Sequence, residues 1–378
     1  MPQSPSDLDC DPHVTRNDFE DFLDLLKQLI RHPSVVGSEH SFFRTLQREL
    51  DETGAKVTLY EGLLVAQGSQ PDSMHISAHV DRHGLICTGP NEFQYAAFVA
   101  RNRGDLLGDS VSEQTYQTIS GRFHDRPVQA YVPWSGTYLG RGSITRSYLC
   151  ERRGNLVFEL EGMEHVLPGT PVAYLDRLAI RDGRLIGQLD NILTVAMLVY
   201  IFRRGFQGTA LFTAQEEVGR SWRYLLEWYH RYDRTTRDLL VLDTSPFADV
   251  TTADDQQIVL RKRDANAEFN GTMVQRLEDL CRQRGLSYTF KDERIKQQNL
   301  VRETEGKTPL SLGSTELGRL TMATAGEIQG ATLQVPTTGY HTPEETASVA
   351  SVEAALDLLV DLALHDPESS QVTTAYTR

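Results

Sequence analysis

Residues 208–219 have the sequence Gly-Thr-Ala-Leu-Phe-Thr-Ala-Gln-Glu-Glu-Val-Gly, in which a short apolar run ends at two adjacent carboxylates. An apolar run of this length between turn residues is typical of a buried β-strand. Two neighbouring glutamates repel each other unless a cation or a shared proton lies between them. A solvated acidic turn is the alternative, and the buried-type strand together with the Val-Gly that follows the pair favours the first interpretation. The stretch therefore predicts a strand that delivers carboxylates to a site.

Helical and extended patterns alternate on both sides of this stretch. In the first part, apolar residues recur at helical spacing over 18–31 and again after Gly37, and short β-type runs cover 56–60, 63–67 and 74–80. After residue 184 the expected elements are helices at 191–203, 222–232, 271–284, 316–323 and 349–365, with strands at 208–213, 238–243 and 327–335. Alternation of this kind predicts an α/β fold with a mixed, mostly parallel sheet flanked by helices.

The stretch from Gly84 to about Arg184 has a different texture. Helical periodicity is hard to find there, and strand candidates at 128–132, 156–160 and 172–174 alternate with Gly, Pro and Asn turns. This pattern predicts an inserted all-β domain. We therefore expect a catalytic domain made of residues 1–83 and 180–378, interrupted by a β-rich domain over 84–179.

Four further segments place an imidazole or a carboxylate at the end of an apolar run or before a turn. They are His79-Val80-Asp81, Leu189-Asp190-Asn191, Leu242-Asp243-Thr244 and Tyr340-His341-Thr342. An α/β sheet presents its active-site residues at the carboxyl ends of its strands. Each segment alone has a simpler explanation, such as a strand-end loop for His79 and Asp81 or a helix N-cap for Asp190. Together with Glu216 and Glu217, the set favours a metal-dependent enzyme.

The residue types define the chemistry of such a site. An imidazole such as His79 binds a divalent metal, and a carboxylate two residues on, here Asp81, can accept the other ring N–H. Asp190 is placed to bridge two cations, and Glu216 and Glu217 divide naturally into a general base and a ligand. Mixed imidazole and carboxylate ligands suit zinc, cobalt or manganese better than copper, and no thiolate is involved. Two such ions about 3.5–4 Å apart activate water and polarise a carbonyl.

Composition narrows the class of protein. The chain has 378 residues and a formal net charge of −14, which argues against nucleic acid or an anionic membrane surface as partner. Its four cysteines (Cys10, Cys87, Cys150 and Cys281) are far apart, which indicates free thiols. The first 17 residues have no apolar core typical of a signal peptide, and no stretch approaches the ~20 apolar residues of a membrane span. We expect a cytoplasmic protein.

With these segments the sequence resembles metallopeptidase family 42, the glutamyl and leucyl aminopeptidases that build tetrahedral particles. The resemblance covers roughly residues 19–364 and is most specific at 79–81, at 215–219 and in His341-Thr342-Pro343-x-Glu345. It implies a zinc-exopeptidase-like domain that acts on short peptides, a dimerising insertion, a homo-oligomer (dimer or dodecamer) and a cis peptide bond between Asp190 and Asn191.

The same resemblance implies how the site residues divide. One metal would be held by His79, Asp190 and Asp243, and the other by Asp190, Glu217 and His341. By the same resemblance, Glu216 would be the general base and Asp81 would orient His79.

Spacing separates this family from its relatives. Asp190 lies 109 positions after Asp81, whereas the related carboxypeptidases and deacylases carry their insertion between later ligands. The sister aspartyl aminopeptidases also have an early insertion, and Leu189-Asp190-Asn191 is similar to their motif. Their chains are generally longer, so the aspartyl aminopeptidases are the second choice of family for this sequence. Two alternatives to an aminopeptidase remain. One is an amidohydrolase or deacylase acting on a non-peptide amide, and the other is a catalytically silent relative with a binding or assembly role.

The sequence also departs from the family pattern. Arg82 stands where a Glu commonly follows the Asp, Asn191 where the family has Asp-Arg after the bridging Asp, and Glu316 where an Asp is usual. Thr337 and Thr338 stand where a basic residue often precedes the final His. These departures leave the predicted ligands and base in place, so we expect them to bear on substrate preference and assembly.

Overall fold

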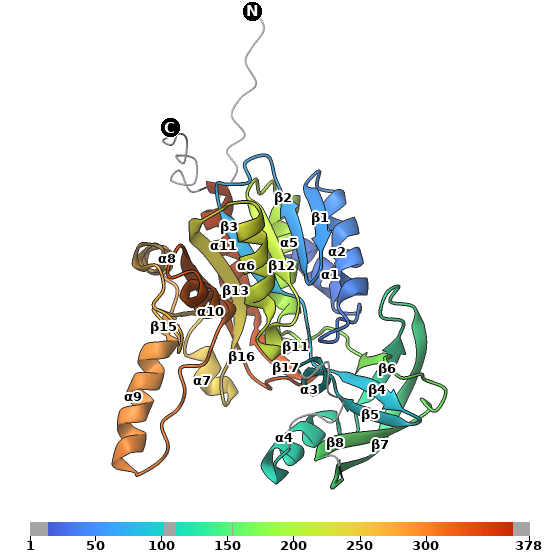
Figure 1. Ribbon diagram of the computed structural model, residues 1–378. Helices are drawn as coiled ribbons and strands as arrows, with labels where there is room; N and C mark the ends of the chain where they lie inside the picture. Colours follow the sequence, from blue (N-terminus) through green and yellow to red (C-terminus); the bar gives the residue numbers. More distant parts are fainter. Residues whose placement is uncertain (1–13, 102–110, 153, 366–378) are drawn as a thin grey trace, which may run out of the picture.

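The computed structural model describes residues 14–101, 111–152 and 154–365 (Figure 1). Cys10 and nearly all of the segment considered for a signal peptide lie outside these residues. No helix in the described ranges is long and apolar enough to cross a lipid bilayer.

An eight-stranded sheet forms the centre of the larger part of the molecule. Its strand order is β1 (Lys56–Tyr60), β2 (Leu63–Gln67), β12 (Thr209–Thr213), β3 (His75–His79), β13 (Thr236–Pro246), β16 (Ile328–Thr337), β14 (Ile258–Leu260) and β15 (Tyr288–Phe290). The four central strands, from β12 to β16, are parallel to one another, and β1, β2 and β14 join antiparallel to their inner neighbours. The predicted mixed, mostly parallel sheet is confirmed.

Helices cover both faces of this sheet (Figure 1). One group contains α1 (Arg16–Leu29), α2 (His40–Asp51), α5 (Ile192–Arg203) and α11 (Val349–Val360), which continues as a π-helical turn over Asp361–His365. On the other face, α6 (Ser221–Arg231) packs against α10 (Glu316–Ala323). Every residue of α5 from Ile192 to Phe202 is buried, which explains its almost continuous apolar sequence.

Side chains of β3 alternate between these two faces. Ile76 and Ala78 join the apolar core, while Ser77 bonds Glu316 of α10 and His75 bonds Tyr229 of α6. His79 has the same parity as His75 and Ser77, so it lies on the α6–α10 face at the carboxyl end of the strand. The expected alternation along this strand thus positions the first site residue.

The inserted segment folds into a closed six-stranded barrel with its own core. Its strand order is β4 (Leu85–Gly89), β5 (Glu92–Tyr95), β8 (Asn155–Glu161), β7 (Tyr138–Cys150), β6 (Pro127–Tyr131) and β9 (Pro171–Tyr174). The predicted β-rich insertion is confirmed, and it also contains two helices, α3 (Ala96–Arg101) and α4 (Glu113–Phe123). The periodicity did not reveal α4, because only Ile119 and Phe123 of that helix are buried.

The remaining elements lie around the large sheet. A three-stranded sheet is formed by β10 (Ala179–Arg181), β11 (Arg184–Gly187) and β17 (Glu345–Ser348). The other helices are α7 (Val250–Asp254), α8 (Gly271–Gln283) and α9 (Lys291–Thr304), with a 3₁₀ turn over Glu216–Val218. Sequence analysis missed α9, since only Asp292 and Ile295 of its residues are buried and no apolar stripe marks it.

Candidate metal centre

Three predicted ligands meet at the carboxyl ends of the central strands. His79 ends β3, Asp243 lies in the adjacent parallel strand β13, and Asp190 directly precedes α5. His79 Nε2 lies 3.3 Å from Asp190 Oδ1 and 3.6 Å from Asp243 Oδ1. The three ligand atoms lie within 4.8 Å of one another, a spacing at which one metal ion could contact all three. We call this group the first cluster.

A second group of ligand atoms lies beside the first. Glu217 Oε2 is 2.9 Å from His83 Nε2 and 3.2 Å from His341 Nε2, and these three residues form the second cluster. Asp190 connects the two clusters, because its Oδ2 lies 3.7 Å from His341 Nε2 while its Oδ1 faces His79. The two oxygens of one carboxylate therefore face two separate sets of ligands.

Several of these ligand atoms are buried without a hydrogen-bond partner. They are Asp190 Oδ1, His83 Nε2 and His341 Nε2. Buried polar groups are normally paired, because an unpaired one retains its full desolvation cost. Imidazole nitrogens and carboxylate oxygens that converge in this way fit a divalent cation such as zinc. The residues present therefore fit the metal centre that the sequence predicts.

Asp81 holds the turn that carries the two glutamates. Its two carboxylate oxygens accept the backbone N–H groups of Glu216 at 2.9 Å and Glu217 at 3.1 Å. Its Oδ1 also lies 3.5 Å from His79 Nδ1. One buried carboxylate thus connects the end of β3 with the turn after β12, a role beyond the orientation of His79 that the resemblance implies.

The backbone of this turn is unusual at both ends. Gln215 has a φ of +61°, a left-handed conformation that is uncommon for residues other than glycine. At the other end Gly219 has a φ of +68°, and a Cβ there would lie 1.8 Å from Nη1 of Arg319, which donates a hydrogen bond to the Gly219 carbonyl. The glycine of the Val-Gly noted in the sequence is therefore needed for the shape of the turn.

Glu345 holds the other two ligand segments together. Its Oε2 accepts the N–H of Asp190 at 2.8 Å and its Oε1 accepts the N–H of His341 at 2.6 Å. The buried carboxylate lies at the start of β17, where the antiparallel ladder pairs Glu345 with Gly187 of β11. The peptide bond between Asp190 and Asn191 is cis, as predicted.

Charges within the clusters shift the pKa values of the adjacent Glu216 and Glu217 in opposite directions. Burial and the nearby carboxylates of Asp243, Glu217 and Asp81 raise the pKa of Glu216 well above its usual range, although His79 opposes them. Burial also acts to raise the pKa of Glu217, but His341 and His83 outweigh it and hold that pKa well below its usual range. The adjacent glutamates therefore lie in distinct electrostatic environments.

Two cations lie near the acidic first cluster. Arg261 is buried and its Nε donates to Gln334 Oε1 at 2.9 Å, and the Gln334 amide nitrogen lies 3.4 Å from Asp243 Oδ2. Burial lowers the pKa of Lys291 to about 7, with Arg261 adding to the shift and Asp243 and Asp190 opposing it. The basic run 261–263 could attract acidic side chains, but its sequence favours a solvated surface. Lys262 and Arg263 are exposed in this way, whereas Arg261 is buried.

The departures from the family pattern have structural roles near the site. Arg82 turns away from the ligands and bonds Ser34 Oγ at 3.0 Å and the Ile30 carbonyl at 3.1 Å. Glu316 is buried below His79 and accepts the hydroxyl groups of Ser77 and Thr213, at 2.6 and 2.7 Å.

The other two departures also pair with neighbouring chain segments. Asn191 donates its amide to the Leu242 carbonyl at 2.9 Å, next to Asp243. The hydroxyl groups of Thr338 and Thr346 are 2.8 Å apart. Asn191 and Thr338 thus contact chain segments that carry or adjoin the ligands.

Sequence reasoning placed the five predicted ligands, Glu216 and Asp81 in one region, and the structure brings them together. The alternative interpretation of Asp190 as a helix cap is wrong, because Asn191 is the N-cap of α5 and makes no side-chain cap bond. His83 belongs to the second cluster but was not among the predicted ligands. Alternation of side chains along an extended segment already places it on the same side as His79 and Asp81, and this was the available signal.

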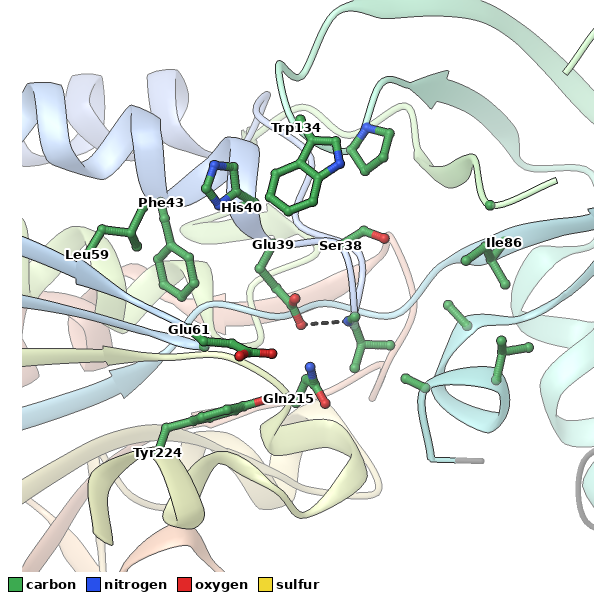
Figure 2. A pocket seen from close by; sticks show the side chains of 18 of the residues that line it. Ser38, Glu39, His40, Phe43, Leu59, Glu61, Ile86, Trp134, Gln215 and Tyr224 are labelled. Carbon is green, nitrogen blue, oxygen red and sulfur yellow. Dashed lines mark hydrogen bonds between the residues drawn. The ribbon is translucent and has the colours of Figure 1, made fainter. Parts of the chain in front are cut away.

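A large cavity lies beside the Gln215 turn (Figure 2). It has a volume of about 750 Å³, and none of the cluster residues lines it. Glu39 and Gln215 face each other in its centre, with Tyr224, Phe43 and Trp134 around them. Burial and the charge of Asp81 raise the pKa of Glu39 to about 8. The cavity therefore adjoins the candidate metal centre through Gln215 and Asp81.

Comparisons with known proteins agree with this architecture. No family model matches the chain. A curated protein of Acetivibrio thermocellus, described as "Putative aminopeptidase", is 22% identical over 360 residues, which are 90% of this chain and 98% of that protein.

Among solved structures, a TET aminopeptidase from a marine sediment archaeon of the Thaumarchaeota matches with a TM-score of 0.67 and 17% identity, over 93% of this chain and 98% of that one. The TET1 peptidase of Pyrococcus horikoshii, which can assemble into a tetrahedron or a large octahedral shell, matches with a TM-score of 0.63 and 17% identity, over 91% and 99%. An M18-family aminopeptidase of Thermotoga maritima matches with a TM-score of 0.55 and 11% identity, over 92% and 97%. The predicted resemblance to the tetrahedral aminopeptidases is confirmed, and at these identities it establishes the fold.

Proposed function

We propose that the protein is a metal-dependent aminopeptidase that uses two divalent ions to remove N-terminal residues from short peptides. The observation that carries this proposal is the position of Asp190 between the two clusters, with Oδ1 3.3 Å from His79 Nε2 and Oδ2 3.7 Å from His341 Nε2. Zinc or cobalt is the preferred ion, and manganese also suits these ligands. The names of the two TET neighbours and of the curated relative support peptide hydrolysis.

The proposed roles follow from the two clusters. His79, Asp190 and Asp243 would hold one ion, and Asp190, Glu217 and His341 would hold the other. When bound, two divalent ions activate a water molecule and polarise the scissile carbonyl. Glu216 takes a proton from that water and returns it to the nitrogen of the leaving amine. Asp81 keeps Glu216 in place through the backbone N–H that it accepts at 2.9 Å.

The Glu216→Gln variant tests the base. Glutamine keeps the shape of the side chain but cannot take up the proton, so kcat should fall by more than ~100-fold, the lower limit for loss of general base catalysis. The metal content should stay at two ions per chain. Glu327→Gln, at an exposed position, is the matched control. Normal turnover in Glu216→Gln would exclude the assignment.

Two rival functions are separable by experiment. An amidohydrolase or deacylase would prefer N-acyl amino acids over aminoacyl anilides, and a screen of both classes decides between them. A catalytically silent relative would bind no metal. Metal analysis of protein purified without chelator distinguishes it, since the proposed enzyme carries two ions per chain.

We also propose a homo-oligomer, a dimer or a dodecamer, formed through the inserted domain. The barrel carries exposed apolar side chains that a partner could cover: Trp134, Tyr138, Leu139 and Leu167. Exposed groups of this kind often mark interfaces. Light scattering should give at least a dimer mass, and Trp134→Glu should lower it. The cytoplasmic location is likewise a proposal, supported by the buried free thiols of Cys87 and Cys281.

A further inference from the structure

His83 lies in the second cluster but belongs to neither ligand set expected from the resemblance. Its side chain is buried, its Nε2 is 2.9 Å from Glu217 Oε2, and its ring centre is 3.8 Å from that of His341. His341 Nε2 lies 3.2 Å from the same oxygen, and among the described residues neither nitrogen makes a well-directed hydrogen bond. Two imidazole nitrogens thus converge on one carboxylate oxygen.

We infer that His83 is an additional protein ligand of the ion held by Glu217 and His341. The inference rests on the proposed two-metal function. With Asp190 shared between the clusters, this ion receives four protein ligands: His83, His341, Glu217 and Asp190. Four protein ligands complete the tetrahedral shell that zinc takes in closed, structural sites. The ion between His79, Asp190 and Asp243 has three ligands and keeps an open position.

One side chain distinguishes the exposure of the two positions. The side chain of Asp243, in the first cluster, is 25% exposed, whereas those of His83 and Glu217 are 5% and 7% exposed. Solvent therefore reaches the first cluster beside Asp243. The second cluster should bind its ion tightly, and the first cluster should exchange its ion faster.

The barrel holds His83 in the orientation that this role requires. His83 Nδ1 lies 2.6 Å from the hydroxyl oxygen of Tyr95, a residue of β5, and the two rings stack. Arg122 of α4 donates a hydrogen bond to the same oxygen at 3.2 Å. When His83 Nδ1–H donates to this oxygen, Nε2 is left with its lone pair directed at Glu217 and an ion. A second partner of this kind fixes the tautomer of metal-binding histidines.

Two other interpretations explain less. A histidine that only fills the core does not explain why a second imidazole, that of His341, faces the same carboxylate oxygen. A protonated His83 could instead replace the second ion and pair with Glu217 as a salt bridge. That arrangement directs two imidazoles at one carboxylate oxygen, whereas an ion satisfies both imidazoles and the carboxylate.

Titration of chelator-stripped protein with Co²⁺, followed by its visible absorption, tests the inference. Four-coordinate Co²⁺ absorbs more strongly than six-coordinate Co²⁺. The wild-type protein should bind two ions, and the tighter one should give the intense spectrum. His83→Leu should weaken the tighter step by more than ~100-fold, because loss of a partner that only orients a ligand already costs 10–100-fold. The weaker step should remain unchanged.

Tyr95→Phe provides a milder variant in case His83→Leu does not fold. It removes the hydroxyl that His83 contacts, and the tighter step should weaken by ~10-fold. Tyr174→Phe is the matched control, since it removes another buried barrel hydroxyl, one that bonds the Arg122 carbonyl at 3.3 Å. His75→Leu controls for loss of a buried imidazole at the far end of β3.

The outcomes are distinct. Two unchanged steps in both His83→Leu and Tyr95→Phe would show that His83 is not a ligand while leaving the proposed function intact. One ion in the wild type and two in His83→Leu would show that His83 replaces an ion. A wild-type protein that binds no Co²⁺ would overturn the proposed function together with this inference.

Discussion

Replacement of Arg82 by methionine separates a structural role from a role in substrate preference. Arg82 is 3% exposed and bonds Ser34 Oγ and the carbonyls of Ile30 and His32 in the segment between α1 and α2. Its guanidinium is also 3.6 Å from the buried carboxylate of Asp176. These contacts predict that Arg82→Met lowers stability and leaves substrate preference unchanged.

The expected loss can be estimated from these contacts. Methionine has a similar volume but leaves Asp176 as a buried, uncompensated charge, and removal of one partner of a buried ion pair costs about 3–5 kcal/mol. The carbonyls of Ile30 and His32 also lose a donor. Adding Asp176→Asn removes the uncompensated charge, so Arg82→Met/Asp176→Asn should recover part of the loss.

The loss should depend on pH. Burial raises the pKa of Asp176 to about 6, and Arg82 opposes this shift. Because the folded-state pKa lies above that of the unfolded chain, the contribution of Asp176 to stability is present at low pH and is lost as pH rises through about 6. Without Arg82 the folded-state pKa rises further. The difference between wild type and Arg82→Met should therefore be largest above pH 6 and smaller at pH 5.

Urea unfolding at pH 7.5 and pH 5, with metal and protein concentrations held constant, measures this difference. The ratio of kcat/KM between two aminoacyl anilides measures preference. Equal stability of wild type and variant at pH 7.5, or a changed ratio without a stability loss, would refute this account of Arg82.

Three further predictions concern the turn, the ligand segments and the ions. Gly219→Ala places a side chain at a positive φ against Arg319, so it should lower stability by about 1–3 kcal/mol and reduce turnover. Urea unfolding and a peptidase assay measure these two effects. A fully active, stable variant would contradict the clash. Glu345→Gln retains one acceptor for the two N–H groups of Asp190 and His341, so metal affinity in equilibrium dialysis should fall ~10-fold; unchanged affinity would contradict the proposed positioning. Removal of ions with a chelator should lower the unfolding temperature, since an ion at 100 times its Kd stabilises by about 2.7 kcal/mol; an unchanged melting curve would argue against ordered metal sites.

Local patterns predicted much of the fold because the central elements are buried. The predicted strands 56–60 and 63–67 match β1 and β2 residue for residue, and the predicted helix 316–323 matches α10. α9 was missed because its buried contacts are few and its surface is polar, so no periodicity marks it. Strand β14 has three residues and was missed as well, since a run of this length gives no pattern to detect.

The candidate site was predictable where a ligand directly follows a recognisable strand. His79 and Glu217 belong to this class, because β3 and β12 are clear in the sequence and lie side by side in parallel. The contacts that organise the site were not predictable. Glu345 accepts two N–H groups from segments that lie 155 and 4 positions away, and no local pattern specifies which backbone groups a buried carboxylate will meet.

Arg82 and His83 show how one period-2 pattern assigns neighbouring residues to different tasks. On an extended segment successive side chains point in opposite directions, so His79, Asp81 and His83 share one side and Arg82 points to the other. Arg82 accordingly reaches the Ile30 carbonyl, and His83 reaches Glu217. A departure from the family pattern at Arg82 therefore acts on the packing of the segment before α2. His83, one position later, acts directly on the ligand set, so the parity of a position along this segment indicates which of the two effects a substitution will have.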